Sequence, residues 1–144
     1  MEKLESFARQ FADISFPNAV RHGRKYFDVS PDLLALSEKI NSDLFSIGVF
    51  LGEDKGRFMP SLALLEMLAR KSTHKVFLNK KAEWLFLCGR DVLEQGISRC
   101  DTEPGLVLVQ NELDENLGYG LLSKKENLMV KNILDRGDFL RRET

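Results

Sequence analysis

The chain of 144 residues contains 43% apolar and 30% charged residues, a balance that is typical of a folded globular protein and excludes a disordered one. Its 21 basic and 22 acidic residues give a net charge of −1, so any nucleic-acid site must be a local patch rather than a field around the whole chain. No run of residues approaches the ~18 apolar residues of a membrane helix, and the charged start of the chain lacks the apolar stretch of a signal peptide. We therefore expect a cytoplasmic protein without membrane contacts.

The first predicted element is an amphipathic helix. Apolar residues recur at three- and four-residue steps from Leu4 to Ile14, with charged residues between them, and Pro17 ends the pattern. A short strand is expected over residues 25–29. Ser30 and Pro31 then provide an N-cap and a proline at the first helical position, which predicts a second helix up to about residue 40 and a turn at 41–43.

A hairpin and a helix are expected next. The mostly apolar residues 45–51 predict one strand, residues 52–56 a polar turn with glycine at each end, and residues 57–59 the returning strand. Pro60 and Ser61 open a helix that ends in Arg70 and Lys71, basic residues at the end that the helix dipole favours. Residues 72–74 form the predicted seam between two domains.

Beyond the seam the pattern indicates mostly strands. Gly89 stops a short helix over residues 81–87, and residues 92–97 are predicted as a strand or a bulged loop. Glycines at 118 and 120 indicate a bulge or a close approach of the backbone. Further strands are expected at 75–78, 106–109, 117–122, 128–130 and 132–134. Several short strands at tight spacing predict an α+β protein whose second half is a small β-barrel.

Catalytic chemistry finds little support in the sequence. His22 and His74 are the only histidines and stand in no metal-binding spacing. Cys88 and Cys100 lack the paired spacing of a metal cage or a disulfide framework, and we expect both to pack in the core. The enzymatic alternative is a Cys88 nucleophile with His74 as its base, and the apolar residues before Cys88 disfavour it. We predict a protein with no catalytic site, metal or cofactor.

Short basic clusters are the remaining candidates for a binding site. Arginine and lysine pair with phosphates, and several clusters have an aromatic neighbour. Taken singly, each cluster is more often a solvated face. The clusters are residues 21–26, Lys80 and Lys81 with Trp84, Lys124 and Lys125, and Arg136 with Arg141 and Arg142. The last cluster is favoured because it closes the strand-rich module.

Two segments carry a resemblance to a known family. Residues 86–97 resemble the helix-to-strand signature of PUA domains (pseudouridine synthase and archaeosine transglycosylase), and residues 135–143 resemble the end of that domain in one subgroup. Upstream, residues 46–48, Gly52 and residues 58–69 resemble the pre-PUA domain of the same subgroup. These relatives are the small two-domain proteins of archaea and eukaryotes of the Nip-seven type, which are large-subunit ribosome biogenesis factors.

The resemblance implies a function that composition and spacing do not show. It implies an α+β protein with a small α/β pre-PUA domain of antiparallel strands at residues 1–72, which docks proteins. A PUA-like β-barrel with one or two short helices would follow at residues 73–144 and bind RNA. The expected role is non-catalytic RNA binding in large-subunit assembly and pre-rRNA processing. Partners would be rRNA first, tRNA second, and other ribosome-assembly proteins through the N-terminal domain.

Two other functions stay open beside this one. The protein could be an accessory protein or enzyme of tRNA or rRNA modification, since PUA domains are often attached to catalytic domains. It could also be a protein-interaction adaptor, which would suit its near-zero net charge.

The residues expected to contact RNA all lie in the second half of the chain. Gly89 is expected to end its helix in a left-handed turn that exposes backbone amides to a phosphate, and Gly96 to allow close approach of the RNA backbone. Arg141 and Arg142 are expected on the last strand and to face opposite sides, so that one of them serves structure. The full set of expected RNA contacts is Arg141, Arg142, Arg136, Arg90, Gly89, Gly96, Lys80 and Lys81.

Overall fold

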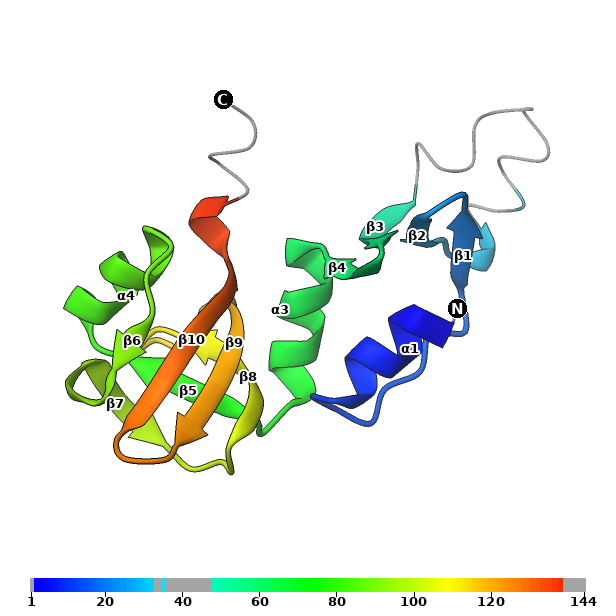
Figure 1. Cartoon of the computed structure of the whole chain (residues 1–144). Coiled ribbons are helices and arrows are strands. Elements are labelled where there is room, and N and C mark those ends of the chain that lie inside the picture. The colour runs from blue at the N-terminus through cyan, green and yellow to red at the C-terminus, as the bar shows by residue number, and fades with distance from the viewer. Residues whose placement is uncertain (1, 33–34, 36–47, 139–144) are drawn as a thin grey trace. The chain divides into compact units, whose positions relative to one another are not determined.

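The computed structural model describes residues 2–32, 35 and 48–138, and these residues form a mixed α+β fold, as predicted. The chain divides into two compact units, Met1–Leu68 and Ala69–Thr144. The boundary lies within helix α3 (Leu62–Lys71), a few residues before the seam expected at residue 72. Each unit contains its own β-sheet (Figure 1).

The N-terminal unit contains a four-stranded antiparallel sheet in the order β1-β2-β3-β4. Helix α1 (Glu2–Arg9) lies against this sheet, and its Phe7 ring packs on Phe58 with 5.2 Å between centroids. Leu4, Phe7 and Ala8 are the buried face of the helix, in agreement with the predicted period. The strands are β1 (Ala19–His22), β2 (Lys25–Asp28), β3 (Val49–Lys55) and β4 (Arg57–Pro60).

Helix α1 ends at Arg9, so the prediction of a helix through Ile14 is wrong in its length. Residues 10 and 11 form a turn in which the amides of Phe11 and Ala12 both donate to the Ala8 carbonyl, at 3.0 and 3.1 Å. Residues 13–15 are Asp, Ile and Ser, all weaker helix formers than alanine or leucine. Phe11 is nevertheless buried. The apolar spacing therefore continues beyond the last residue of the helix, which is why the sequence predicted a longer one.

Strands β1 and β2 form a hairpin of which only the second strand was predicted. Gly23 and Arg24 form its two-residue turn, and His22 pairs with Lys25. Gly23 has φ +62° at the first central position, as a type II′ turn requires. Strand β1 has no alternation of apolar and polar residues that would have marked it in the sequence.

The β3–β4 hairpin is confirmed, but the turn predicted over residues 52–56 is much shorter. Strand β3 continues to Lys55, which pairs directly with Arg57. Gly52 allows this because a Cβ there would overlap the Phe58 ring, so glycine permits β4 to approach closely. Only Gly56, with φ +90°, makes the turn, and its amide donates to Asp54 Oδ1 at 3.1 Å.

Helix α3 begins where Pro60 and Ser61 predict it. Ser61 Oγ accepts a hydrogen bond from the Leu64 amide at 3.1 Å, which makes Ser61 the N-cap. Leu64, Leu65 and Leu68 are fully buried. Of the helix predicted after Pro31, residues 31, 32 and 35 are helical. The rest of it, the turn at 41–43 and the strand residues 45–47 lie outside the described residues.

The C-terminal unit is a nearly closed, barrel-like sheet in the order β6-β10-β9-β8-β5-β7. Strand β5 pairs with β8 in parallel, and the other neighbours are antiparallel. This confirms the predicted barrel. Its elements are β5 (Lys75–Leu78), α4 (Lys80–Leu87), β6 (Val92–Leu93), the 3-10 helix η2 (Glu94–Gly96), β7 (Ile97–Cys100), β8 (Gly105–Gln110), β9 (Asn116–Lys124) and β10 (Leu128–Asp135).

A single apolar core fills this sheet and is covered by α4, which contributes Ala82 and Phe86. The predicted close approach at Gly118 is present, because a Cβ there would overlap the Leu134 carbonyl oxygen of β10. The core residues are Val76, Leu78, Ala82, Phe86, Val92, Val107, Val109, Leu117, Leu122 and Val130.

Three local predictions in this unit need correction. Residues 92–97 are not one strand, because η2 separates β6 from β7, which was not predicted. The strands predicted at 128–130 and 132–134 are one strand, β10, with an irregularity between Asn132 and Leu134. Cys88 is exposed at the end of α4 instead of buried, whereas Cys100 packs partly against the core as expected.

Candidate nucleic-acid interface

The start of helix α4 is fixed to the turn that carries η2. Asn79 is the N-cap, and its Oδ1 accepts from the Ala82 amide at 2.9 Å. Its Nδ2 donates to the Gln95 carbonyl at 3.2 Å, and its amide donates to the Gly96 carbonyl at 3.0 Å. The Asn79 side chain thus caps the helix and holds Gln95 beside it, while the Asn79 backbone amide holds Gly96.

Packing within the fold explains why residue 96 is a glycine. A Cβ at this position would lie 2.7 Å from Ala82 Cβ and 2.9 Å from Val92 Cγ1. The close approach that this glycine permits is therefore between η2, α4 and β6. Its predicted contact with an RNA backbone stays a prediction.

The end of helix α4 has the left-handed turn that Gly89 predicts, with φ +91°. The Gly89 amide donates to the Phe86 carbonyl at 2.9 Å, and the Arg90 amide donates to the Leu85 carbonyl at 3.1 Å. This pair of bonds is the Schellman motif. The expectation that the turn exposes these amides to a phosphate is therefore wrong, because both are already bonded within the helix end.

Strand β10 holds the loop after α4 in place. The Asn132 amide donates to Asp91 Oδ1 at 2.8 Å, and its Nδ2 donates to the Phe86 carbonyl at 2.9 Å. The same Nδ2 lies 3.2 Å from Asp135 Oδ2. The turn after α4 is thus bonded to the helix through the Gly89 and Arg90 amides, and to the sheet through the Asp91 side chain and the Arg90 carbonyl, which lies 3.5 Å from Asn132 Nδ2.

A groove of about 300 Å³ lies between these elements, and we call it the α4 groove. Lys81 and Leu85 line it from α4, Arg90 and Asp91 from the loop, and Gln95 from η2. Lys81 and Arg90 are exposed, and neither side chain has a hydrogen bond or ion pair within the described part of the chain. The remaining lining residues are Asn79, Ala82, Val92, Leu93 and Gly96.

Lys80 and Lys81 stand in the first turn of α4, where cations are unfavourable. The first turn of a helix presents the positive end of the helix dipole, which stabilises anions and repels lysine. Lys80 is also exposed and has no ion-pair partner among the described residues. Trp84, the single tryptophan of the chain, is 66% exposed one turn further along. The first turn thus holds two lysines against one acidic residue, Glu83, next to an exposed aromatic ring.

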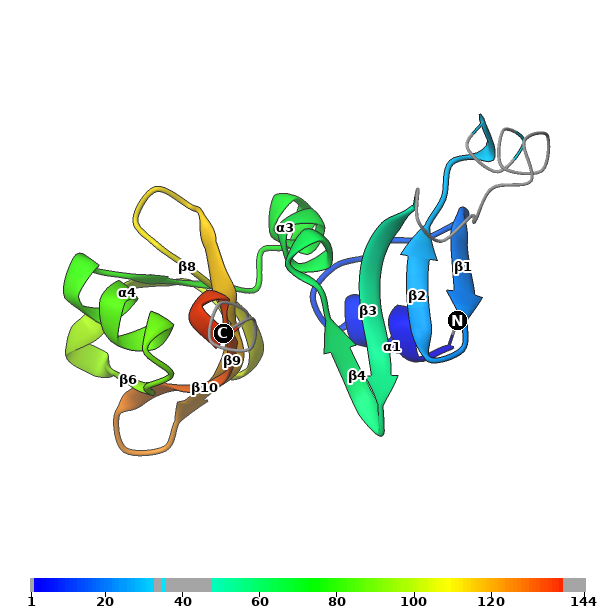
Figure 2. The same ribbon diagram turned by 90° about the horizontal axis from the view of Figure 1, so that it is seen from above.

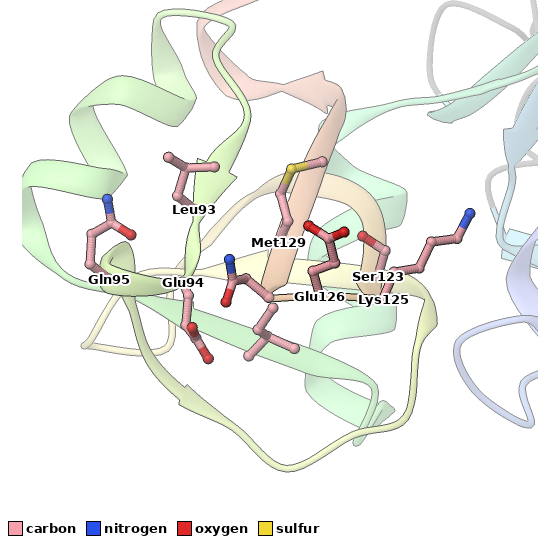
Figure 3. A pocket seen from close by; sticks show the side chains of 9 residues that line it. Leu93, Glu94, Gln95, Ser123, Lys125, Glu126 and Met129 are labelled. Atoms are coloured by element: carbon pink, nitrogen blue, oxygen red, sulfur yellow. The ribbon is translucent and has the colours of Figure 1, made fainter.

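A second groove of about 510 Å³ adjoins the first, and we call it the hairpin groove. It lies between β6 and the turn that joins β9 to β10, and Leu93 and Met129 are a cross-strand pair within it (Figure 3). Leu93 and Gln95 line both grooves, so the two are continuous. Its charged residues are Glu94, Glu126 and Lys125, which gives it no excess of positive charge.

A third groove lies along β5 and β7, but its cations are neutralised. Lys75 lies 3.2 Å from Asp114, and Arg99 lies 3.2 Å from Asp101 and stacks on the Phe77 ring at 4.2 Å. Phosphates would have to compete with these carboxylates. Among the described residues, no three His, Cys, Asp or Glu side chains are grouped as metal ligands would be.

Of the residues predicted to bind RNA, the structure brings together Lys81, Arg90 and Gly96, with Lys80 and Gly89 adjacent to them. Arg136 is not part of this groove. It is half-buried, and its guanidinium donates to the Asn116 carbonyl at 3.2 Å. Strand β10 ends at Asp135 and residues 136–138 are helical, while Arg141 and Arg142 lie outside the described residues.

Seven residues that line the α4 groove were not predicted from the sequence as part of the site: Asn79, Ala82, Leu85, Asp91, Val92, Leu93 and Gln95. Asn79 had a visible signal, because asparagine directly before a predicted helix is a typical N-cap. The role of Asp91 depends on Asn132, forty-one residues away, and no local pattern indicates it.

No helix within the described ranges is long and apolar enough to cross a membrane.

Comparison with known proteins relates this chain to one family. Residues 74–144 match the family described as the UPF0113 PUA domain. The chain is 36% identical to a UPF0113 protein of Archaeoglobus fulgidus, over 67% of this chain and 62% of that protein, so it spans less than two thirds of that relative's length. It is 28% identical to the 60S ribosome subunit biogenesis protein NIP7 homolog of Sus scrofa, over 85% of this chain and 76% of that protein.

A solved structure supports the same fold. The conserved PUA domain protein from Thermoplasma acidophilum superposes with a TM-score of 0.53 at 23% identity, over 65% of this chain and 69% of that chain. The predicted PUA-like barrel is therefore confirmed as a fold.

Proposed function

Residues 74–144 of this chain match the UPF0113 PUA-domain family, and from this match we propose that the protein binds RNA without catalysing a reaction and acts in assembly of the large ribosomal subunit. The bound RNA would be ribosomal, and tRNA is the less favoured ligand. The resemblance to a NIP7 homolog, whose name assigns it to 60S subunit biogenesis, supports this setting.

The α4 groove is the observation that carries the proposal. Lys81 from α4 and Arg90 from the loop after it both line a groove whose backbone is held by Asn79, Gly89 and Asn132. A phosphate between the two cations would supply the anion that neither has within the described residues. Because the backbone is already ordered, RNA binding would not have to order it, and little conformational entropy would be lost there.

The surroundings of the groove suit a single-stranded or looped RNA. Trp84 provides an exposed ring for base stacking beside Lys80, and such stacking tolerates any base. Gln95 and the continuous hairpin groove offer amide and carboxylate groups to base edges. Phosphate contacts would therefore lie at the α4 groove, and base contacts beyond it.

Docking of other assembly proteins is assigned to the N-terminal unit. Val49 and Phe50, at the start of β3, are exposed apolar side chains of the kind that protein interfaces cover. The docking role in this proposal therefore rests on the resemblance and on these two exposed side chains.

The groove is tested with the double variant Lys81→Gln/Arg90→Gln in the full chain. Labelled single-stranded RNA is titrated while fluorescence anisotropy reports total binding and Trp84 emission reports events beside the groove. Loss of two phosphate contacts should weaken binding roughly 25-fold at 0.1 M salt, since each contact contributes about −0.7 to the slope of log K against log salt. The matched control is Lys71→Gln/Lys131→Gln, which removes the same charge from exposed positions outside the groove. Equal affinity of the groove variant and the control would contradict the proposal.

The cellular role is tested by crosslinking the protein to RNA in its native cell and sequencing the recovered RNA. Enrichment of large-subunit rRNA or its precursor is expected. Enrichment of tRNA alone would contradict a role in subunit assembly and would indicate a role in RNA modification or transport. Recovery of no RNA would favour the protein-adaptor alternative and contradict the proposal.

A further inference from the structure

Two hairpin turns that are distant in the sequence bring basic residues together at one end of the N-terminal sheet. Figure 2 shows that the β1–β2 and β3–β4 turns lie at the same end of this sheet. The Asp54 amide donates to the Arg24 carbonyl at 2.7 Å, and Lys25 pairs with Glu53, so the turns are adjacent. We call this end the basic pole, made of Lys3, Arg21, Arg24, Lys25, Lys55 and Arg57.

The basic pole carries a local charge opposite to that of the chain. Its six cations together with the carboxylates Asp54 and Glu53 sum to a charge of +4, on a chain whose net charge is −1. Lys3 lies 2.7 Å and Arg21 3.9 Å from Asp54, so one carboxylate serves two of the cations. The hydrogen bond from Lys3, helped by the charge of Arg21, holds the pKa of Asp54 below its ordinary value, although partial desolvation opposes this.

The other four cations are not used by the fold. Arg24, Lys25, Lys55 and Arg57 are exposed, and their side chains make no hydrogen bond or ion pair within the described residues. Like charges held close together repel one another, and Glu53, directly across from Lys25, offsets one part of this repulsion. An anionic partner outside the chain would offset it.

The surroundings of the pole favour a phosphate backbone over an acidic protein. Protein interfaces have an apolar core, and the exposed large apolar side chains of this unit's described residues are Val49 and Phe50. Both lie at the far end of β3 from the pole, because β3 runs from Val49 to Lys55. Three of the six cations are arginines, whose planar guanidinium binds phosphate oxygens in pairs.

We propose that the basic pole is a second RNA contact of this protein, which binds the phosphate backbone without reading its sequence. It is separate from the α4 groove and does not depend on binding there. In this arrangement the N-terminal unit contributes affinity for RNA in addition to its docking of proteins.

The test is the double variant Arg24→Gln/Arg57→Gln in the full chain, titrated with the same labelled RNA at several salt concentrations. Arg24 lies in the β1–β2 turn and Arg57 begins β4, and both side chains are exposed and without partners in the described structure. The fold should therefore be retained, as circular dichroism would verify. If both contact phosphate, affinity falls roughly 25-fold at 0.1 M salt and the salt slope decreases by about 1.4. The change in Trp84 emission at saturation should stay as in the wild type.

The matched control is Arg9→Gln/Arg70→Gln, which removes two exposed cations away from the pole and should change affinity less than about twofold. Wild-type affinity and slope in the pole variant would overturn the inference and leave the α4 groove standing. A pole variant that binds RNA normally but loses binding to a polyglutamate peptide would also overturn it, and would make the pole a site for acidic proteins. Failure of the wild type to bind any RNA would overturn both proposals.

Discussion

The α4 groove and the basic pole present positive charge in two different ways. In the groove, Lys81 and Arg90 stand on a backbone bonded by Asn79, Gly89 and Asn132, and the space between them is concave. In the pole, the cations gather at the end of the sheet where two hairpins turn, with Lys3 of α1 among them, and four of them have no partner within the described residues. A concave, ordered site can select the shape of its ligand, whereas a set of exposed cations adds attraction to any polyanion.

The largest effect is expected from a substitution that disrupts the C-terminal unit, and with it the α4 groove, while leaving the basic pole intact. Gly118→Val would drive a side chain into the Leu134 carbonyl of β10, which also carries Asn132 beneath the groove. We expect a loss of roughly 3 kcal/mol or more in the stability of the C-terminal unit, measured by urea denaturation. Groove-dependent changes in Trp84 emission should disappear. Gly105→Val, at a glycine with open space around it, is the control for a strained backbone alone.

The C-terminal arginines test whether the groove extends beyond the described residues. Arg141→Ala/Arg142→Ala should weaken RNA binding about 5- to 25-fold at 0.1 M salt and reduce the slope by roughly 0.7 to 1.4, depending on whether one or both contact phosphate. Salt-dependent anisotropy titrations measure both quantities. An unchanged slope, together with a reduced slope in the pole variant, would assign the electrostatic contribution to the N-terminal unit.

A smaller effect distinguishes backbone order from charge. Asn79→Ala removes the N-cap of α4 and the bond to the Gln95 carbonyl, and should cost about 1 kcal/mol of stability. RNA affinity should fall a few-fold although no charge changes, because the groove loses the hydrogen bond that holds Gln95 in place. Ser61→Ala removes the cap of α3 at a similar cost and should leave RNA affinity unchanged. Equal affinities of the two variants would show that order in the groove does not matter.

The smallest expected effect is at Asp54. Asp54→Asn keeps an acceptor for the Gly56 amide but removes the carboxylate that Lys3 and Arg21 share, so RNA binding at the pole should strengthen modestly. The pKa of Asp54 is lowered in the folded state, so its stabilising contribution is present above the ordinary value of 3.8 and is lost as the pH falls below it. Wild type and variant should therefore differ in Tm at neutral pH and converge in acid. Glu112→Gln, an exposed carboxylate in the other unit, should show neither effect.

The sequence predicted those elements whose signals are local. Pro60 and Ser61 marked the start of α3, Gly89 marked the end of α4, and the buried runs of β5, β8 and β9 were visible as apolar segments. Strands β1 and β7 were missed because each is a four-residue strand without a clear alternation, and its pairing partner is what defines it. Strand β3 was cut short at Gly52 because glycine there signals close packing rather than a turn.

The candidate site was predictable in part, because some of its residues are close together in the sequence. Its cations lie between residues 80 and 90, so one helix and its cap indicated them together. The use of the Gly89 and Arg90 amides could not be seen, because a glycine that ends a helix does not say which carbonyls its turn bonds. The pole was seen only as the cluster at residues 21–26, since Lys55 and Arg57 join it through the pairing of β2 with β3.

The strand order of the C-terminal unit has a consequence for the order in which the protein folds during synthesis. Strand β5 needs β8 beside it, and β6 needs β10, so the sheet cannot be built by adding successive hairpins. Residues 79–96 leave the ribosome well before Asn132, which bonds to the end of α4 and to Asp91. The nascent chain therefore carries an incomplete groove until β10 has emerged, and its ability to hold a ligand there should arise late and abruptly.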